Sequence, residues 1–83
     1  MNLYLIQQDI NNDYDTYDRA VVIATSEEEA RTIHPAGYRW EDDKWSVTDI
    51  NTWCHPEHVT VKCIGITLLG QVGDVICASF NAG

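Results

Sequence analysis

The sequence predicts an α+β fold: a small antiparallel β-sheet in the order β-β-α-β-β, with one short helix packed on one face. Three observations predict it. Apolar runs of strand length lie at residues 2–8, 19–25, 59–69 and 75–80. A helix-capping pattern follows the second run, and a glycine-rich turn separates the last two. Strands in this order favour a sheet with a helix on one face.

The first strand is predicted at residues 2–8, where bulky side chains fall on both faces. This pattern is typical of a central strand packed on both sides, or of a strand with an aromatic outer face. Residues 9–18 are rich in Asn and Asp and predict a polar loop, because these side chains form turns with their own backbone. Residues 19–25 hold the run Ala-Val-Val-Ile-Ala and give the clearest strand.

The helix is predicted to begin at Ser26, because Glu29 stands three residues later and completes a capping box. Glu27 and Glu28 lie in the first turn, where the helix dipole favours negative charge. The helix should end at His34, which precedes a proline and therefore resists helical geometry.

Residues 38–58 predict an ordered loop that is held in place by its tryptophans. A helix is not predicted here, because the spacing of the three Trp residues fits no single helix face. Residues 59–63 alternate cleanly between apolar and polar side chains. A glycine-rich turn at residues 70–74 follows, and then a last strand at residues 75–80. We expect these last two strands to pair as an antiparallel hairpin.

Length and composition favour one globular domain spanning residues 1–83. Apolar residues make up 45% of the chain, too many for a disordered protein. A chain of this length buries only a little over ~60% of its unfolded surface, so its core should be small. No apolar run has membrane-spanning length, and the start lacks the features of a signal peptide. We therefore expect a cytoplasmic protein with no membrane partner.

The net charge is −8, and most acidic residues lie in residues 1–29 and 41–57. Direct binding to nucleic acid is not expected, because phosphates require a basic patch. An acidic face suits a basic partner protein and speeds the encounter with it. The alternative is that the acidic surface serves solubility alone.

A partner-binding face is predicted where tyrosine and tryptophan stand beside acidic residues, because these aromatics are frequent interface anchors and charges form a polar rim. Its predicted members are Asp13, Tyr14, Asp15, Tyr17, Asp18, Trp40, Glu41, Asp42, Asp43 and Trp45, with Asp9 adding to the charge. The alternative is that the tryptophans complete a small core under the long loop.

A metal site is an alternative to the partner-binding face. Cys54, His55 and His58, with Cys63 nearby, are ligand types that zinc accepts. Their spacing matches no standard zinc motif, so we expect no metal and no cofactor. The chain has three cysteines, and an odd number argues against a disulfide framework. Cys63 and Cys77 lie in apolar runs and are predicted to be small core residues.

Three further motifs are absent or incomplete. Asn11, Asp13 and Asp15 alternate as in a calcium-binding loop, but the glycine that such a loop needs at its sixth position is Thr16. No glycine-rich phosphate loop and no nucleophile elbow is present. We therefore expect a protein that is not an enzyme.

Several stretches carry a family resemblance. They are residues 1–6, 14–18 with 20–22, 27–31 with 33–35, 53–54, 59–61 with 64–65, and the tail Ala78-Ser79-Phe80-Asn81-Ala82-Gly83. With them the chain resembles a group of small, uncharacterised proteins of tailed phages and prophages. The group has no assigned activity, so the resemblance transfers no catalytic residue. It implies a phage accessory protein.

By analogy, small acidic phage proteins of this kind include inhibitors of host defence such as anti-CRISPR proteins. An acidic face can act as a DNA mimic by placing carboxylates where phosphates would sit. We therefore expect a non-catalytic protein that binds a host or defence protein. The alternatives are a small metal-binding module and a self-associating accessory protein that buries its exposed aromatics in a homodimer.

Overall fold

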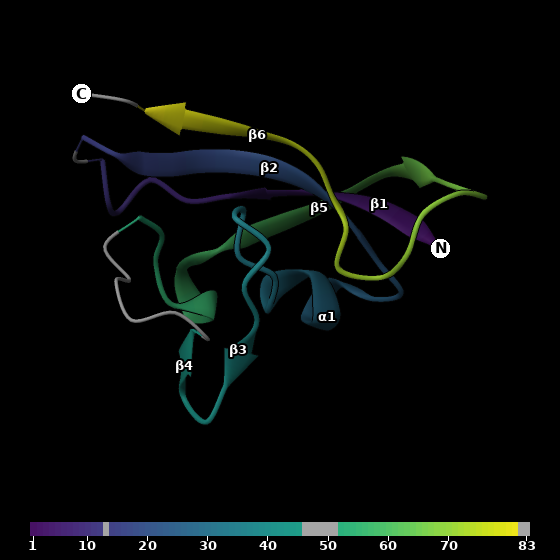
Figure 1. Cartoon of the computed structure of the whole chain (residues 1–83), viewed down its shortest axis with the longest axis horizontal. Helices are drawn as coiled ribbons and strands as arrows, with labels where there is room; N and C mark the ends of the chain where they lie inside the picture. Colours follow the sequence, from purple (N-terminus) through teal and green to yellow (C-terminus); the bar gives the residue numbers. More distant parts are fainter. Residues whose placement is uncertain (13, 46–51, 82–83) are drawn as a thin grey trace.

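The computed structural model describes residues 1–12, 14–45 and 52–81, and these form a mostly antiparallel β structure with one short helix (Figure 1). The elements in chain order are β1 (Asn2–Gln7), β2 (Thr16–Ala24), α1 (Glu27–Arg31), β3 (Trp40–Glu41), β4 (Lys44–Trp45), the 3-10 turn η1 (Pro56–His58), β5 (Thr60–Ile66) and β6 (Val75–Asn81). A small antiparallel sheet with a short helix was predicted. The predicted order left out β3, β4 and η1.

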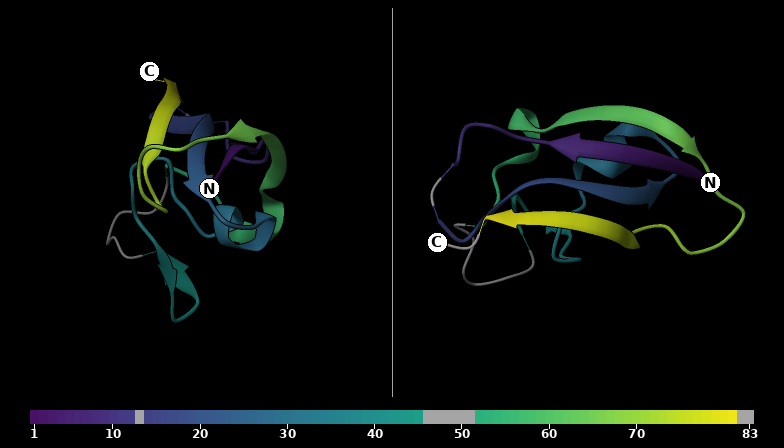
Figure 2. Two further views of the ribbon diagram at one scale, coloured as in Figure 1. Left: turned by 90° about the vertical axis from the view of Figure 1, so that its right-hand side faces the viewer. Right: turned by 90° about the horizontal axis from the view of Figure 1, so that it is seen from above.

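The main sheet has the strand order β5-β1-β2-β6, and every neighbouring pair is antiparallel. β5 and β6 therefore lie at opposite edges of the sheet, and the hairpin predicted for the last two strands is wrong (Figure 2). The chain between them is long enough to cross the end of the sheet. Thr67 N–H donates to Met1 O beside β1, and Gly73 N–H donates to Ile23 O beside β2.

Glycine is required where this connection passes over the sheet. Gly70 has φ +95°, and a Cβ at this position would lie 2.5 Å from Cδ1 of Ile23. Both the left-handed backbone and the close approach exclude a larger residue. The contact also explains why Ile23 is buried.

The core lies between the sheet and the layer that holds α1 and the β3–β4 hairpin (Figure 1). Side chains of the two central strands alternate, so that Tyr4, Ile6, Ala20 and Val22 are buried against this layer. The residues between them, such as Leu5 and Val21, are half-buried. β1 is thus central in the sheet, the first of the two alternatives predicted for it, but its second face is less well covered than its first.

Both cysteines predicted for the core are exposed. Cys63 lies on β5 and Cys77 on β6, and these are the two edge strands. The apolar character of the two runs was visible in the sequence, but their place at the edges was not. The prediction of core positions for Cys63 and Cys77 is therefore wrong.

The predicted helix cap is present with one difference. Glu29 N–H donates to Ser26 Oγ at 3.1 Å, as in a capping box. The Glu29 carboxylate reaches one residue further back than expected, and accepts from Thr25 N–H at 2.7 Å and from the Thr25 hydroxyl at 3.0 Å. The helix is short, and its one buried residue, Ala30, packs into the core. The cap therefore supplies much of what fixes the start of α1.

We expect Ser26→Ala to lower the free energy of unfolding by about 1 kcal/mol, because the N–H of Glu29 loses its acceptor. Ser26→Asp should keep most of the stability, since its carboxylate can accept the same bond. Urea unfolding followed by circular dichroism measures both. An alanine variant as stable as the wild type would show that the cap does not stabilise α1.

Candidate functional site

A buried glutamine organises the start of the β1–β2 loop, which the structure describes at residues 8–12 and 14–15. Oε1 of Gln8 accepts from the N–H groups of Ile10 and Asn11 at 3.0 and 2.9 Å. Its Nε2 donates to the carbonyl oxygens of Asn11 and Tyr17, both at 2.8 Å. One side chain thus satisfies four backbone groups and fixes the loop against β2. No sequence pattern indicated this role for Gln8, because glutamine is not a typical turn residue.

Two predicted binding residues stand out from this loop. Tyr14 is 77% exposed, and Asp15 beside it is exposed as well. Asp15 has φ +61°, a left-handed conformation that Asp and Asn tolerate better than most residues. Its N–H donates to Asn81 O at the end of β6, so the tip of the loop is held to the sheet. The predicted member Asp13 lies outside the described residues.

A shallow hollow of about 290 Å³ lies where this loop meets the end of β6. It is lined by Asn12, Thr16, Asp18, Ser79, Phe80 and Asn81. A hydrogen bond from the Ser79 hydroxyl holds the pKa of Asp18 below its usual range, and Arg19, 3.2 Å from the carboxylate, adds to this effect. Asp18 is therefore charged at neutral pH, and the hollow has a negative wall.

The second acidic segment is the tip of the β3–β4 hairpin. Asp42 and Asp43 have φ +53° and +62°, the pair of left-handed residues that a type I′ turn requires. Both aspartates and Glu41 are exposed. The hairpin was not predicted, because Asp-Asp is a much weaker turn signal than Asn-Gly.

Most of the predicted aromatic members are packed within the molecule. Trp45 is 2% exposed, and its Nε1 donates to Cys54 O at 3.0 Å. Trp40 is half-buried and meets Trp45 edge to face at 5.1 Å between ring centroids. Tyr17 is also half-buried and packs against Phe80 at 4.8 Å. These contacts remove Trp45 from any surface that a partner can touch and leave Tyr14 as the most exposed aromatic among the predicted members.

The two acidic segments do not form one surface. The β1–β2 loop lies at the left end of the sheet in Figure 1, whereas the β3–β4 hairpin projects below the helix layer. The views in Figure 2 agree with this separation. Asp9, Asp15 and Asp18 therefore lie at one end of the sheet, whereas Glu41, Asp42 and Asp43 lie on the separate β3–β4 hairpin.

The aromatic packing centres on His34, which is fully buried. Ring centroids of Tyr38, Trp45, Tyr17 and Trp53 lie 5.1, 5.4, 5.9 and 6.3 Å from the imidazole. Nδ1 accepts from the N–H of Ala36 at 2.9 Å, so the proton of the neutral ring is on Nε2, which lies 3.1 Å from the Thr52 hydroxyl.

Burial lowers the pKa of His34 from 6.5 to about 4, because the charged form would lose its hydration. The ring is therefore neutral at physiological pH. The sequence predicted His34 only as the end of the helix, and no motif pointed to its place among the aromatic rings.

The predicted metal candidates do not converge. Cys54 is buried, and burial raises the pKa of its thiol to about 11, so it is not a thiolate at neutral pH. The His55 ring packs on Trp40 at 5.1 Å, and His58 is exposed beside Glu57. Within residues 1–12, 14–45 and 52–81, no three His, Cys, Asp or Glu side chains come together as metal ligands. The metal-binding alternative therefore has no geometric support in this part of the chain.

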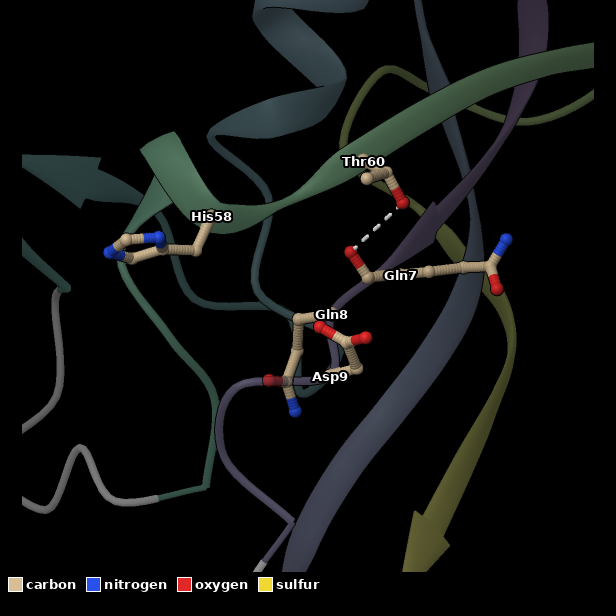
Figure 3. A pocket seen from close by; sticks show the side chains of 5 residues that line it. All are labelled: Gln7, Gln8, Asp9, His58 and Thr60. Atoms are coloured by element: carbon tan, nitrogen blue, oxygen red, sulfur yellow. Dashed lines mark hydrogen bonds between the residues drawn. The ribbon is translucent and has the colours of Figure 1, made fainter.

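A second hollow, of about 160 Å³, lies between the end of β1 and the start of β5 (Figure 3). Its lining residues are Gln7, Gln8, Asp9, His58 and Thr60. The His58 ring points away from Asp9, and the Gln7 side chain points away from both (Figure 3). Thr60 Oγ1 is 3.3 Å from Gln7 O and fastens the two strands. The arrangement brings no acid, base and nucleophile together.

Comparisons with protein-family models, curated proteins and solved structures found no match to this chain. In the part that the structure describes, no helix is long and apolar enough to cross a membrane. The functional argument therefore depends on the surface features themselves.

We expect stability to fall as the pH is lowered from about 6.5 to about 4. The unfolded chain binds a proton on His34 below pH 6.5, whereas the folded chain does so only near pH 4, so protonation favours unfolding in this window. The loss should reach about 3 kcal/mol. Urea unfolding at a series of pH values measures it.

The control for this prediction is the exposed histidine His58. His34→Gln should flatten the pH dependence between 6.5 and 4, and His58→Gln should leave it as in the wild type. Equal pH dependence in all three proteins would contradict the burial of a neutral imidazole.

Proposed function

We propose that this chain is a non-catalytic protein-binding module whose main contact surface is the β1–β2 loop. The observation that carries the proposal is the exposed Tyr14 at the tip of a loop held in place by Gln8, with carboxylates on both sides in the sequence. A rigid aromatic side chain loses little entropy on binding, and charged neighbours form the rim of such an anchor.

The charge of this surface favours a basic partner. Residues 9–18 hold four aspartates and neither lysine nor arginine. Asp18 is kept ionised by Ser79 and Arg19 and forms a wall of the hollow beside the loop. An arginine or lysine of the partner would meet opposite charge there, and the same charge would speed association at low salt.

The resemblance to small phage and prophage proteins suggests the kind of partner. We infer that the partner is a host or defence-system protein. In the most specific form of this proposal, the partner is a nucleic-acid-binding defence complex of the type that anti-CRISPR proteins inhibit. In that version the aspartates of the loop occupy sites that normally contact phosphates. This step rests on analogy with other phage proteins and not on the chemistry of a site.

Neutralising the loop should weaken capture of the partner. Asp9→Asn with Asp15→Asn removes two negative charges from a net charge of −8, and asparagine tolerates the left-handed backbone of Asp15. We expect this variant to lose a partner that the wild type retains from bacterial lysate at low salt and releases at high salt. Mass spectrometry of the eluates and binding kinetics with the purified partner measure the effect.

The hairpin tip supplies a matched control. Asp42→Asn with Asp43→Asn removes the same charge, also at left-handed positions, but at the other acidic segment. Binding should survive in this control. If both double variants bind equally well, or if only the hairpin variant fails, the β1–β2 loop is not the contact surface.

Tyr14→Ala should reduce affinity for the identified partner about thirtyfold, mainly through faster dissociation, because a central aromatic anchor contributes about 2 kcal/mol. The fold should not change, since the side chain is mostly exposed. Ile10→Ala is the control, because Ile10 is 57% exposed in the same loop. Surface plasmon resonance measures both variants, and an equal loss from the two would remove Tyr14 as a specific anchor.

A further inference from the structure

β6 is an unprotected edge strand. Its sequence Val-Ile-Cys-Ala-Ser-Phe-Asn holds neither a charged residue nor a proline, and every residue after Val75 is exposed. It pairs with β2 on one side only, within the four-stranded sheet that the structure describes. Along Val75–Phe80, no other strand of the described residues pairs with its outer edge, and such an open edge on an apolar strand is normally blocked or paired in natural proteins.

The other edge of the same sheet has protection that β6 lacks. β5 carries Lys62, and α1 packs against it. Charge on an edge strand and a covering helix are both common ways to prevent pairing with another chain. Figure 1 shows α1 below the β5 and β1 side of the sheet, with β6 at the far edge. The difference between the two edges indicates that β6 is the one available for pairing.

We propose that β6 of one molecule pairs antiparallel with β6 of a second copy across a two-fold axis, which joins the two four-stranded sheets into one continuous sheet. Such an interface is isologous, so each molecule presents the same surface to the other. The proposal is independent of the partner proposed for the β1–β2 loop, and each can fail without the other.

The charge distribution favours a second copy in this orientation. Two molecules of net charge −8 repel each other. β6 has no charged side chain, so two copies that pair along β6 add no charge repulsion within the strand pair itself. The acidic β1–β2 loop lies at the Asn81 end of β6, because Asp15 N–H donates to Asn81 O. Antiparallel pairing about Ser79 places Asn81 beside Cys77 of the second copy. The two acidic loops then lie on opposite sides of the two-fold axis and point in opposite directions.

The side chains of β6 also suit self-pairing. Two register shifts against β2 leave Ile76 on β6 and Asp18 on β2 without direct partners, so on β6 every residue of Cys77–Asn81 keeps a partner on β2. Centring the two-fold axis on Ser79 places Phe80 of each copy opposite Ala78 of the other. A large apolar side chain then covers a small one on the same face, and Phe80, now 46% exposed, becomes covered.

Molar mass in solution tests the proposal. Size-exclusion chromatography with light scattering should give twice the chain mass for the wild type as its concentration rises towards millimolar. Ala78→Lys should give the monomer, because two lysines would face the dimer centre. This substitution makes the net charge less negative, so general repulsion between the copies decreases and cannot explain dissociation. Ile66→Lys makes the same charge change on β5, where Ile66 is 76% exposed, and should remain dimeric.

Disulfide trapping is a second test that does not depend on a disruptive substitution. In a background with Cys63→Ser and Cys77→Ser, Ser79→Cys should form a disulfide-linked dimer on mild oxidation, since directly opposite residues have the Cα spacing of a disulfide. Thr60→Cys on β5 is the matched exposed control and should remain a monomer. A monomeric wild type at every concentration, a dimer that survives Ala78→Lys, or equal cross-linking at both positions would each overturn the proposal.

Discussion

The packing of aromatic rings around the neutral imidazole of His34 holds the second layer of the molecule on the sheet. Its ring neighbours come from β2, β4 and the segments around Tyr38 and Trp53, so four separate parts of the chain meet at one side chain. Both ring nitrogens are engaged locally, one with Ala36 and one with Thr52. A buried polar group with both atoms satisfied fixes one arrangement of its surroundings, whereas an apolar ring would allow several.

This arrangement decides which residues remain for contact with other molecules. The rings of Trp45 and Trp53 are buried in the core, and Trp40 packs edge to face against Trp45. The hairpin then projects with Glu41, Asp42, Asp43 and Lys44 exposed, while Tyr14 is exposed at the end of the sheet. In a domain of this size, aromatic residues that complete the core are not available to an interface, and the two uses compete for the same side chains.

Local signals in the sequence predicted much of the secondary structure. The strand at residues 19–25 and the cap at Ser26 depend on neighbouring residues, and both are present with small changes. The partners of the last two strands were not predictable in the same way. A strand with a suitable apolar and polar pattern can pair with either edge of the sheet. Contacts of residues 67–74 with Met1 and Ile23, which are far away in the sequence, determine the edge at which β6 pairs. Of the aspartates that the structure describes in the predicted binding face, Asp15, Asp42 and Asp43 are exposed and Asp18 is half-buried, whereas for the tryptophans the structure favours the alternative of packing in the core. Charged side chains are rarely buried, whereas aromatic side chains occur both in the core and on the surface.

Cys54 gives the molecule a built-in reporter of local opening. Its side chain is buried in the core cluster, its backbone carbonyl accepts from Trp45 Nε1, and burial raises the pKa of the thiol, so the thiol reacts slowly while the core around it is closed. Cys63 and Cys77 are exposed and react without any opening. The three thiols therefore divide into two fast sites and one gated site. The rate at which the gated site is modified measures how often the layer around His34 lifts from the sheet, separately from global unfolding.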